Sequence, residues 1–541
     1  MKLRLYAWQE ECLKIWLENG CKGIVNVVTG AGKTALAAAA IEQLLKTDAD
    51  SLRIKIVVPK TFLVRQWSRA LMEYLQVPRK DIGVYFGSRK SVDRKFMIYV
   101  INSARNSLAR HTLRELLSSK PVFIIADECH HYGTDENARI FDFYSWRLAD
   151  KPSMEHHAHD LSIASNTPVY TLGLSATPFC EHFSDVLVPC LGPEIYRFSL
   201  YSALRADIIN MFAVFYICLR FDKYEQGLYN ELTDKIGIAM EELRKCCPNI
   251  GAFNSSSFFA ELRRLIGVGN ELSELALVIM CLFYKRRDVV YNAASRVRCV
   301  FDLVRLIRKD AKIIIFGERI ETADEIYEGL KSIFPNESGI YHSGVHRSVG
   351  ESALKRFEDG EIRILVSCRT LDEGLSITSA DVAIIVSSTN SVRQRIQRLG
   401  RILRKKDNGR QVYFYYLYIY GTTEESVFSQ EHMSGLERQV SFIDLNYNER
   451  TGEFSNNSYN QLVEAVKLRT AKKSWSNEML QELSKNLNKG LITCDWLLPE
   501  EVCEEYIRSA KDKSLRNYFT AILYLIRERR LITTGGRTGD S

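Results

Sequence analysis

The chain has 541 residues, 46% of them hydrophobic, and a formal net charge of +7 at pH 7, which fits three or four domains with sizeable cores and allows nucleic-acid binding through local basic surfaces. No run of eighteen uncharged apolar residues occurs, and charges stand near the start where a signal peptide would be apolar, so the sequence predicts neither a membrane span nor a secretory signal. Its thirteen cysteines form no Cys-x-x-Cys pair, a pattern typical of buried, reduced thiols in a cytoplasmic protein.

A glycine-rich segment is the first motif in chain order. A predicted buried strand at residues 24–28 leads into Thr29-Gly30-Ala31-Gly32-Lys33-Thr34, and an alanine-rich predicted helix follows. Glycines let backbone N–H groups turn toward phosphate oxygens, Lys33 can reach the β- and γ-phosphates, and the Thr34 hydroxyl can bind Mg²⁺. Val27 stands where the strict pattern has its first glycine. An ordinary glycine-rich turn before a lysine is therefore the alternative interpretation.

Two acidic residues follow a second apolar run, at residues 122–126, which has the length of a fully buried parallel strand. Asp127 and Glu128 thus come at the carboxyl end of a strand, where open α/β sheets bind ligands. Asp127 can hold Mg²⁺, and Glu128 can orient or deprotonate an attacking water. A solvated charge pair is the alternative, and the phosphate loop earlier in the chain disfavours it.

Strand-like and helix-like runs divide the chain into two tandem α/β units and a C-terminal region. The first unit, residues 1–205, has predicted strands at 24–28, 54–58, 99–102, 122–126 and 170–175. The second unit, residues 206–435, has predicted strands at 211–220, 312–316, 339–342, 362–367, 382–386 and, as the last one, 412–418. Apolar residues at helical spacing predict a helical insertion at about 222–300 and a mostly helical accessory region at 436–541.

The segment at residues 371–404 connects the sequence with a known family. It contains Asp372-Glu373-Gly374 and ends on a predicted helix with Gln397, Gly400, Arg401 and Arg404. Together with the phosphate loop and Asp127-Glu128-Cys129-His130, it resembles superfamily 2 DEAD/DEAH-type helicases and translocases, and within them the XPB/RadD branch. The likeness extends over about residues 3–422. It implies two tandem RecA-like parallel-sheet domains that bind ATP and Mg²⁺ in the cleft between them.

The arginines of this segment carry the chemistry that the resemblance implies. Phosphoryl transfer spreads negative charge over the γ-phosphoryl oxygens, and an arginine finger stabilises that charge. Arg401 and Arg404 lie about one helical turn apart, so both can face one site. With Gln397 and Glu128 they form the expected catalytic set. Arginines that only make structural salt bridges are the alternative.

Further nucleotide contacts follow from the resemblance alone. Arg4 and Gln9 belong to a segment similar to the family's adenine-recognition motif, and the Gln9 amide has both a donor and an acceptor for the adenine edge. Asp372 and Gly374 resemble the motif whose acidic residue faces ATP. Residues 376 and 378 of that motif depart from the family pattern, which weakens its nucleic-acid assignment more than its ATP assignment.

The resemblance also implies coupling residues and nucleic-acid contacts. We expect His130 to hydrogen-bond across the cleft either to the motif containing Ser175 and Thr177, which links the ATP site to the nucleic-acid site, or to the motif containing Arg401 and Arg404. Residues similar to the family's backbone-contacting motifs are Pro59, Lys60, Arg65, Asn102, Ser103, Gly317, Arg319, Ser343 and Gly344. The expected partner is DNA, single- or double-stranded, and RNA is not excluded.

Three functions are compatible with the sequence. The first is a nucleic-acid-stimulated ATPase that translocates on DNA and remodels or unwinds it, and the second is an ATP-dependent switch that signals unusual nucleic acid to a partner effector. The third, a structural subunit with a dead site, is disfavoured by the intact Lys33, Asp127, Glu128 and Arg404. DNA repair and antiphage defence both use such proteins. The C-terminal region is expected to grip a duplex or dock a protein partner.

Overall fold

The computed structural model describes residues 4–147, 164–247, 256–267, 271–368, 380–387, 400, 402–403, 411–425, 440–471, 477–493, 495–510 and 512–535. The chain forms two compact units. Unit 1 consists of Met1–Met211, Leu371–Ser379 and Ser391–Arg410, and unit 2 of Phe212–Thr370, Ala380–Asn390 and Gln411–Ser541. Within the described ranges, no helix combines the length and the apolar character that a membrane crossing requires.

An eight-stranded sheet forms the centre of unit 1, in the order β4-β3-β5-β2-β6-β7-β1-β8. Its strands are β1 (Ile24–Val27), β2 (Arg53–Val58), β3 (Ile82–Phe86), β4 (Arg89–Lys90), β5 (Phe96–Val100), β6 (Val122–Asp127), β7 (Val169–Ser175) and β8 (Glu194–Phe198). All neighbours pair in parallel except β3 and β4. Parallel strands are covered on both faces, and every residue of β5 and β6 is buried.

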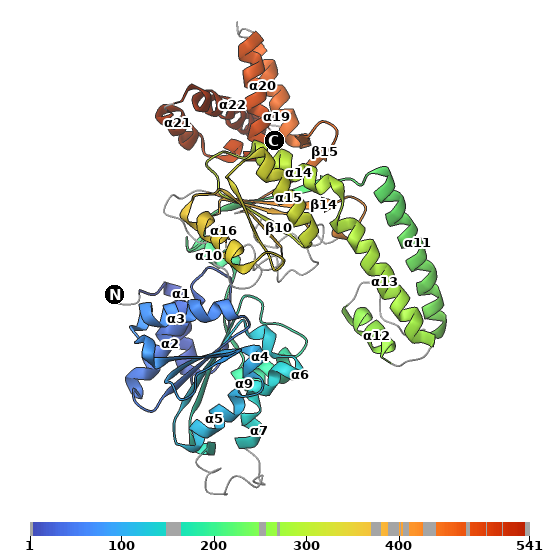
Figure 1. Cartoon of the computed structure of the whole chain (residues 1–541). Helices are drawn as coiled ribbons and strands as arrows, with labels where there is room; N and C mark the ends of the chain where they lie inside the picture. The colour runs from blue at the N-terminus through green and yellow to red at the C-terminus, as the bar shows by residue number, and fades with distance from the viewer. Residues whose placement is uncertain are drawn as a thin grey trace, which may run out of the picture. The chain divides into compact units, whose positions relative to one another are not determined.

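Helices lie on both faces of this sheet (Figure 1). One face carries α1 (Ala7–Glu18), α2 (Lys33–Thr47) and α3 (Thr61–Leu75), and the other carries α4 (Ile101–Ala104), α5 (Leu108–Leu117), α7 (Phe143–Arg147) and α9 (Val188–Leu191). Two further short helices are α6 (Asp135–Ala138) and α10 (Leu200–Arg205). The pattern of α3 explains its packing, because its buried residues recur at helical spacing: Leu63, Val64, Trp67, Ala70 and Leu71.

Unit 2 has its own eight-stranded sheet, in the order β11-β12-β10-β13-β14-β9-β15-β16, with only β15 and β16 antiparallel. Its strands are β9 (Phe212–Leu219), β10 (Ile313–Gly317), β11 (Ser338–Tyr341), β12 (Ile364–Cys368), β13 (Val382–Ile385), β14 (Val412–Ile419), β15 (Ser441–Asn448) and β16 (Glu453–Ser455). Three helices of this unit are α14 (Ala294–Leu306), α15 (Ile320–Ile333) and α16 (Arg347–Asp359). The predicted α/β class with two parallel-sheet units is confirmed.

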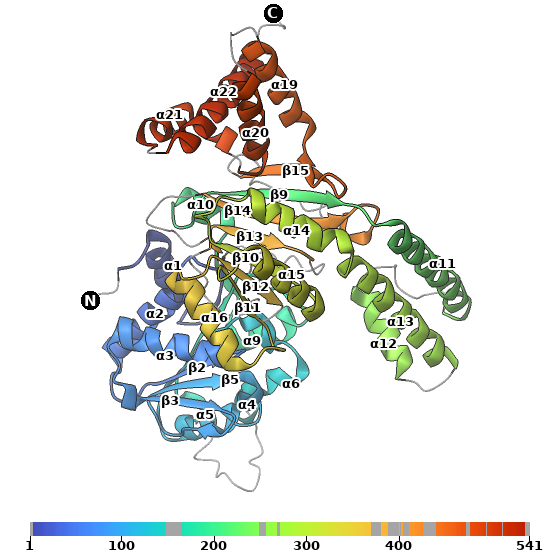
Figure 2. The ribbon, with the colours of Figure 1, turned by 45° about the horizontal axis from the view of Figure 1, so that its top comes forward.

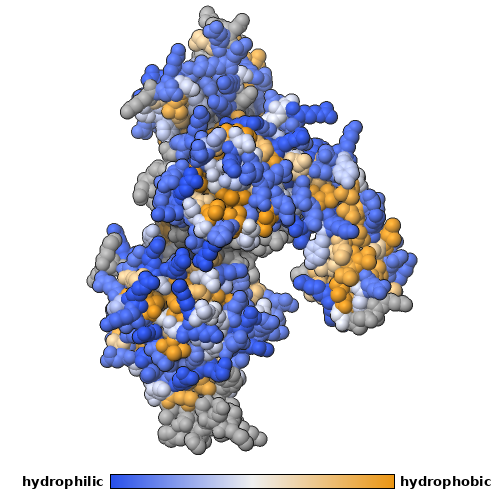
Figure 3. Space-filling view, viewed as in Figure 1, coloured by the Kyte–Doolittle hydropathy of each residue, from blue (hydrophilic) through white to orange (hydrophobic). Residues whose placement is uncertain are grey.

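A helical insertion separates β9 from α14, as predicted. It consists of α11 (Lys223–Cys246), α12 (Ser256–Ile266) and α13 (Glu271–Tyr291), and α11 and α13 lie side by side (Figure 2). The insertion has a hydrophobic core of its own, built from residues such as Ile236, Leu243, Phe258, Leu262 and Ile279. Apolar side chains also gather on its surface (Figure 3), where Leu277, Val278 and Tyr284 of α13 are about half exposed.

The C-terminal region is mostly helical, as predicted, and packs on the core of unit 2. Its helices are α19 (Asn457–Ala471), α20 (Asn477–Thr493), α21 (Glu500–Ser509) and α22 (Lys513–Gly535). Leu487 of α20 and Ile522 of α22 are fully buried in the same cluster as the strands. The hydroxyl of Tyr415 in β14 donates to the carbonyl oxygen of Ile492 at 2.5 Å, which ties this region to the sheet.

The strand predictions were wrong in four places. Residues 412–418 were expected to form the last strand, but β15 and β16 follow; in β15 the buried Ile443, Leu445 and Tyr447 alternate with exposed polar residues, so its mean hydropathy is low. The strand expected at 99–102 ends at Val100, because Asn102 already lies in α4. In unit 1, the pair β3 and β4 was not predicted, and neither was β8.

Cysteines were expected to be buried, but those at 246 and 281 are exposed.

Candidate active site

The phosphate loop turns sharply between β1 and α2. Val27 is the last residue of β1 and fully buried, so the position where the strict motif has a glycine belongs to the strand here. Gly30 and Gly32 have φ angles of 90° and 102°, a region that favours glycine. A β-carbon on Gly32 would also lie 2.6 Å from Nε2 of Gln9. Position 32 therefore requires glycine for both conformation and space.

The residues around these glycines fit a bound phosphate chain. Helix α2 begins at Lys33, so the N–H groups of its first turn and its positive end face the loop. Thr29 and Ala31 are buried, and Thr34 is half-buried in the first turn of the helix. The structure thus brings together every phosphate-loop residue that the sequence singled out.

Gln9 connects the N-terminal segment to the phosphate loop. Its Nε2 donates to the carbonyl oxygen of Gly32 at 2.9 Å, and its Oε1 accepts from the backbone N–H of Tyr6 at 2.8 Å. Gln9 is buried, whereas Arg4 is exposed. The amide of Gln9 is therefore already engaged on both sides within the chain, and adenine recognition by Arg4 and Gln9 stays a prediction.

Asp127 is the last residue of β6, so its carboxylate lies at the carboxyl edge of the sheet. Burial, and after it the charge of Glu128, raise the pKa of Asp127 to about 6, while Lys33 and the Trp67 indole oppose the shift. The negative charge of this carboxylate is costly because it is buried next to another one. Such a carboxylate is suited to a divalent cation, which would remove that cost.

Glu128 adopts a left-handed backbone conformation, with φ 51° and ψ 53°. Its Oε1 lies 3.3 Å from Nζ of Lys33, and its Oε2 lies 3.6 Å from Nδ1 of His130. Non-glycine residues rarely occupy this region, and such conformations cluster at functional sites. The turn directs the Glu128 side chain back over the phosphate loop, toward Lys33.

His130 joins this acidic motif to the end of β7. Its Nδ1 and the Oγ of Ser175 are 2.9 Å apart, and the Ser175 Oγ accepts the backbone N–H of Thr177 at 3.1 Å. The structure thus brings together the three residues expected to couple the two sites. Their coupling role stays a prediction.

Two aromatic residues that sequence reasoning did not assign to the site hold Asp127. The indole N–H of Trp67 donates to Oδ2 of Asp127 at 2.8 Å. The hydroxyl of Tyr132 lies 2.6 Å from the carbonyl oxygen of Asp127 and 2.9 Å from that of Val57. Cys129, two residues after Asp127, is buried, and burial raises the pKa of its thiol, so the sulfur stays neutral.

The residues predicted to contact nucleic acid in unit 1 follow two neighbouring strands, β2 and β5. Lys60 and Arg65 are exposed at the start of α3, next to the buried Pro59. Asn102 is exposed and Ser103 half-buried in α4. Because β2 and β5 are parallel neighbours, their carboxyl ends bring both groups to one edge of the sheet.

Their counterparts in unit 2 follow β10 and β11. Gly317 is the last residue of β10, and Arg319 precedes α15 and forms an ion pair with Asp288 of the insertion helix α13. Ser343 and Gly344 are exposed after β11. The ion pair shows that Arg319 is held by the insertion, which sequence spacing did not indicate.

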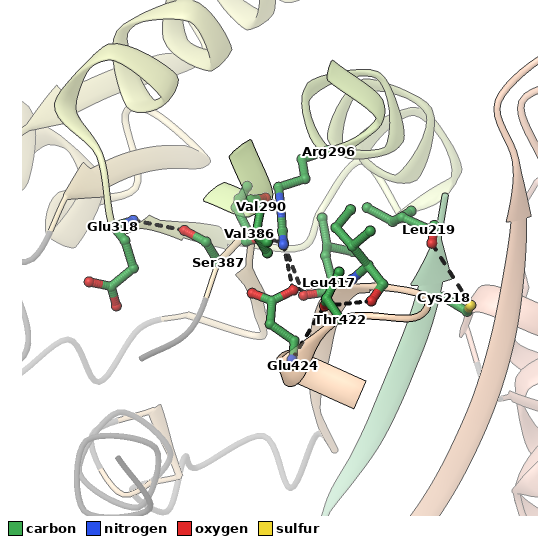
Figure 4. Close-up of polar contacts among 11 residues, drawn as sticks. Cys218, Leu219, Val290, Arg296, Glu318, Val386, Ser387, Leu417, Thr422 and Glu424 are labelled. Carbon is green, nitrogen blue, oxygen red and sulfur yellow. Dashed lines mark hydrogen bonds and ion pairs between the residues drawn. The ribbon is translucent and has the colours of Figure 1, made fainter. Parts of the chain in front are cut away.

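A buried arginine organises the carboxyl ends of β13 and β14 (Figure 4). Arg296 of α14 donates from Nε to the carbonyl oxygen of Val290 at 2.8 Å and from Nη1 to those of Val386 and, at 3.1 Å, Leu417. Its Nη2 lies 2.5 Å from Oε2 of the buried Glu424. No local motif marks Arg296, and only its place in an apolar helix pattern could have drawn attention to it.

Five predicted site residues lie outside the described residues: Asp372, Gly374, Gln397, Arg401 and Arg404. Gly400, which stands among them, is described and belongs to unit 1. A β-carbon on Gly400 would lie 2.6 Å from the Cβ of Thr29. Gly400 therefore touches the phosphate loop closely enough for its position to require glycine.

Two family profiles match the chain in tandem. The type III restriction enzyme res subunit profile matches residues 2–180, and the helicase conserved C-terminal domain profile matches residues 295–406. Together they match more than half of the chain. The chain belongs to superfamily 2 of the helicases. It is an ATP-dependent helicase or translocase, as the motifs predicted.

Curated relatives of this superfamily 2 helicase confirm the expected likeness to the XPB branch. The DNA 3'-5' translocase XPB2 of Sulfurisphaera tokodaii is 26% identical over 75% of this chain and 80% of its own length. The DNA 3'-5' helicase XPB of Mycobacterium tuberculosis is 24% identical over 73% of this chain and 57% of its own length. The chain thus spans most of the first relative and little more than half of the second.

Solved structures support the fold of this helicase. The Pyrococcus furiosus Hef helicase domain matches with a TM-score of 0.51 and 18% identity, over 79% of this chain and 98% of that one. Saccharomyces cerevisiae Dbp5 bound to RNA and ADP BeF3 matches with a TM-score of 0.51 and 14% identity, over 81% and 89%. The expected tandem RecA-like domains are confirmed.

Proposed function

We propose that this protein is a nucleic-acid-stimulated ATPase that translocates on DNA and remodels or unwinds it. The observation that carries the proposal is the contact of Lys33 with Glu128 over a glycine loop, beside the buried Asp127. It combines a cation for phosphates, a base for water and a carboxylate for a metal at one edge of a parallel sheet. The XPB relatives, whose names describe DNA 3'-5' translocation or unwinding, support DNA as the substrate.

Lys33 changes partner during the proposed cycle. Without nucleotide its ammonium group pairs with Glu128. With ATP in the loop, Lys33 turns to the β- and γ-phosphates, and the released carboxylate of Glu128 accepts a proton from the attacking water. Thr34 and Asp127 are the residues that would hold Mg²⁺, which supplies positive charge against the phosphates when bound. The N–H groups at the start of α2 hold the remaining phosphate oxygens.

Gln397, Arg401 and Arg404 are proposed to complete the catalytic set, with Asp372 and Gly374 near the nucleotide. The close packing of Gly400 on Thr29 supports this assignment, because Arg401 is its immediate neighbour in the chain. Replacing Arg404 by Ala should lower turnover at least about tenfold and change nucleotide affinity much less, as for a group used mainly in the transition state. Nucleic acid should not rescue the loss.

Nucleic acid is proposed to bind mainly through its phosphates, to the predicted contact residues that follow β2 and β5 in unit 1 and β10 and β11 in unit 2. The exposed Lys60 and Arg65 at the start of α3 support this, because backbone contacts from basic side chains carry no sequence information. Affinity for DNA should therefore fall steeply with salt and vary little with sequence. Tighter binding of RNA than of DNA in the same assay would contradict the choice of DNA as the substrate.

The dependence of ATPase rate on DNA length tests translocation. A translocase is expected to gain turnover as a homogeneous DNA lengthens and then to reach a plateau, because each binding event supports more steps. A rate that is the same for short and long DNA at equal nucleotide concentration would contradict translocation and would favour a nucleic-acid-gated switch that signals to a partner. Glu128→Gln serves as the matched control, since it should bind DNA and ATP without turnover.

A further inference from the structure

We propose that Trp67 is a positioning residue that links helix α3, where nucleic acid is proposed to bind, to the metal-binding carboxylate of Asp127. The inference rests on the proposed function, because it assigns Lys60 and Arg65 to phosphate binding and Asp127 to Mg²⁺. It adds a direct connection between these two sites within unit 1. The connection consists of one side chain and one hydrogen bond.

The geometry of the contact makes it specific. The indole Nε1 of Trp67 lies 2.8 Å from Oδ2 of Asp127, and the two side chains are 1% and 9% exposed. Indole has a single donor and no acceptor, so this bond is the one polar interaction that Trp67 offers. Because the hydrogen bond is made to Oδ2 alone, it sets the rotation of the Asp127 carboxylate about its Cβ–Cγ bond. The direction in which Asp127 presents Oδ1 therefore depends on where Trp67 stands.

Tyr132 and Trp67 hydrogen-bond to different parts of Asp127, its backbone and its side chain. The Tyr132 hydroxyl lies 2.6 Å from the backbone carbonyl oxygen of Asp127 and so holds the main chain at the end of β6. Trp67 holds the side chain. Removing the Trp67 donor should leave the backbone of Asp127 in place and release only its carboxylate. Loss of an outer partner of a metal-binding group typically costs about 10- to 100-fold in metal affinity.

Helix α3 carries both Trp67 and residues that are proposed to bind nucleic acid. Lys60 precedes its first turn, and Arg65 is exposed two residues before the buried Trp67. Residues two apart lie on nearly opposite sides of a helix, so Arg65 faces outward while Trp67 faces the sheet. A phosphate held by Lys60 and Arg65 therefore fixes the same rigid element that positions the indole. Binding of nucleic acid would restrict α3 and with it the carboxylate of Asp127.

The chain offers a matched control in Trp16 of α1. Trp16 is equally buried, and its Nε1 donates to the carbonyl oxygen of Thr171 at 2.9 Å, in the same unit but to a backbone group. Trp67→Phe and Trp16→Phe each remove one buried indole hydrogen bond and a similar volume. Replacing residue 67 by 3-benzothienylalanine gives a second variant that keeps the indole shape and lacks only the N–H donor.

The experiment measures how much Mg²⁺ is needed for half-maximal binding of a fluorescent ATP analogue, together with the thermal midpoint. Both phenylalanine variants should lower the midpoint similarly. Only Trp67→Phe and the benzothienyl variant should raise the Mg²⁺ requirement, by about tenfold or more, and lower the ratio of DNA-stimulated to basal turnover. Trp16→Phe should change neither quantity.

An unchanged Mg²⁺ curve for the benzothienyl variant would overturn the proposal, as would an equal shift for Trp16→Phe. A shifted curve with a normal stimulation ratio would overturn the link to nucleic acid. Lys33→Ala separates these outcomes from failure of the proposed function: if Lys33→Ala keeps its ATPase activity, the phosphate-loop assignment falls. If Lys33→Ala is inactive and the Trp67 variants behave as wild type, only the positioning role falls.

Discussion

Each unit contains an ion pair that is partly or fully shielded from solvent, and the two pairs are built in opposite ways. In unit 1, Lys33 and Glu128 meet at 3.3 Å with side chains 10% and 12% exposed. In unit 2, Arg296 and Glu424 meet at 2.5 Å with side chains 0% and 5% exposed, and Arg296 also donates to three backbone carbonyl oxygens. The Lys33–Glu128 distance is the longer one and both side chains are partly exposed, so each can leave its partner to interact with a bound substrate. The second is committed to the protein, which shows that burial of charge does not by itself mark a catalytic site.

Breaking the pair in unit 2 should have the largest effect. Arg296→Met leaves Glu424 buried without its cation, which should cost about 3–5 kcal/mol of unfolding free energy. Thermal or denaturant unfolding of unit 2 measures this loss. The double variant Arg296→Met/Glu424→Leu should recover much of it, because apolar residues in place of both charges remove the uncompensated one. If the double variant is no more stable than the single one, the backbone contacts rather than the ion pair hold this region.

Breaking the pair in unit 1 should affect activity instead. Lys33→Ala should lower ATP turnover by about 100- to 1,000-fold, as when one preorganised group that stabilises transition-state charge is lost. Its unfolding free energy should change by only about 1 kcal/mol or less, since a partly exposed pair contributes little. Steady-state ATPase assays and unfolding curves on the same preparation compare the two quantities. Turnover above about a tenth of wild type would contradict the assignment of Lys33 to the phosphates.

Replacing Glu128, the acidic residue of the same pair, should separate nucleotide binding from catalysis. Glu128→Gln keeps the side-chain shape and removes the base, so turnover should fall by about 100-fold or more while ATP still binds. Loss of the Glu128 charge also removes a cause of the raised pKa of Asp127. Equilibrium binding of a fluorescent ATP analogue and single-turnover hydrolysis measure the two steps separately. A variant that fails to bind nucleotide would show that Glu128 has a structural task.

A third buried pair, Lys55 with Glu115 at 2.8 Å, should give the smallest effect and one that depends on pH. Burial lowers the pKa of Lys55 from its ordinary value of 10.5, and Glu115 opposes the shift. Between the lowered pKa and 10.5 the unfolded chain binds more protons, so stability contributed by this group rises with pH.

The thermal midpoint of wild type should therefore gain on that of Lys55→Met as the pH rises toward 10.5. The midpoint difference between wild type and the double variant Arg296→Met/Glu424→Leu should stay constant over the same range, because arginine remains charged and the double variant carries neither group. A constant difference for Lys55→Met would mean that Lys55 keeps its proton throughout. Differential scanning at several pH values, with Arg296→Met/Glu424→Leu as the reference, makes this comparison.

Local patterns predicted the parts of the site that neighbouring residues create. The phosphate loop and Asp127 with Glu128 each depend on a few consecutive residues after a buried strand, and parallel strands bring both to one edge. The Trp67–Asp127 and Arg296–Glu424 contacts join residues 60 and 128 positions apart, and nothing in their own segments specifies the partner.

Strand prediction failed for a related reason. A strand buried on both faces, such as β6, is apolar throughout, whereas β15 alternates polar and apolar residues near the edge of its sheet. Its polar residues resemble those of a loop when composition alone is read. Alternation of apolar and polar residues from Ile443 to Asn448 was the signal that could have identified β15.

The left-handed backbone of Glu128 bears on how such a protein changes over generations. A residue other than glycine pays roughly 1–2 kcal/mol for this conformation, and only glycine or asparagine relieves much of it. With Glu128 as the proposed base, selection for hydrolysis would keep glutamate there against that gain. In a descendant that no longer needs ATP turnover, replacing residue 128 by glycine or asparagine would raise stability in a single step. Such a replacement would then mark the loss of ATPase activity before the phosphate loop changes.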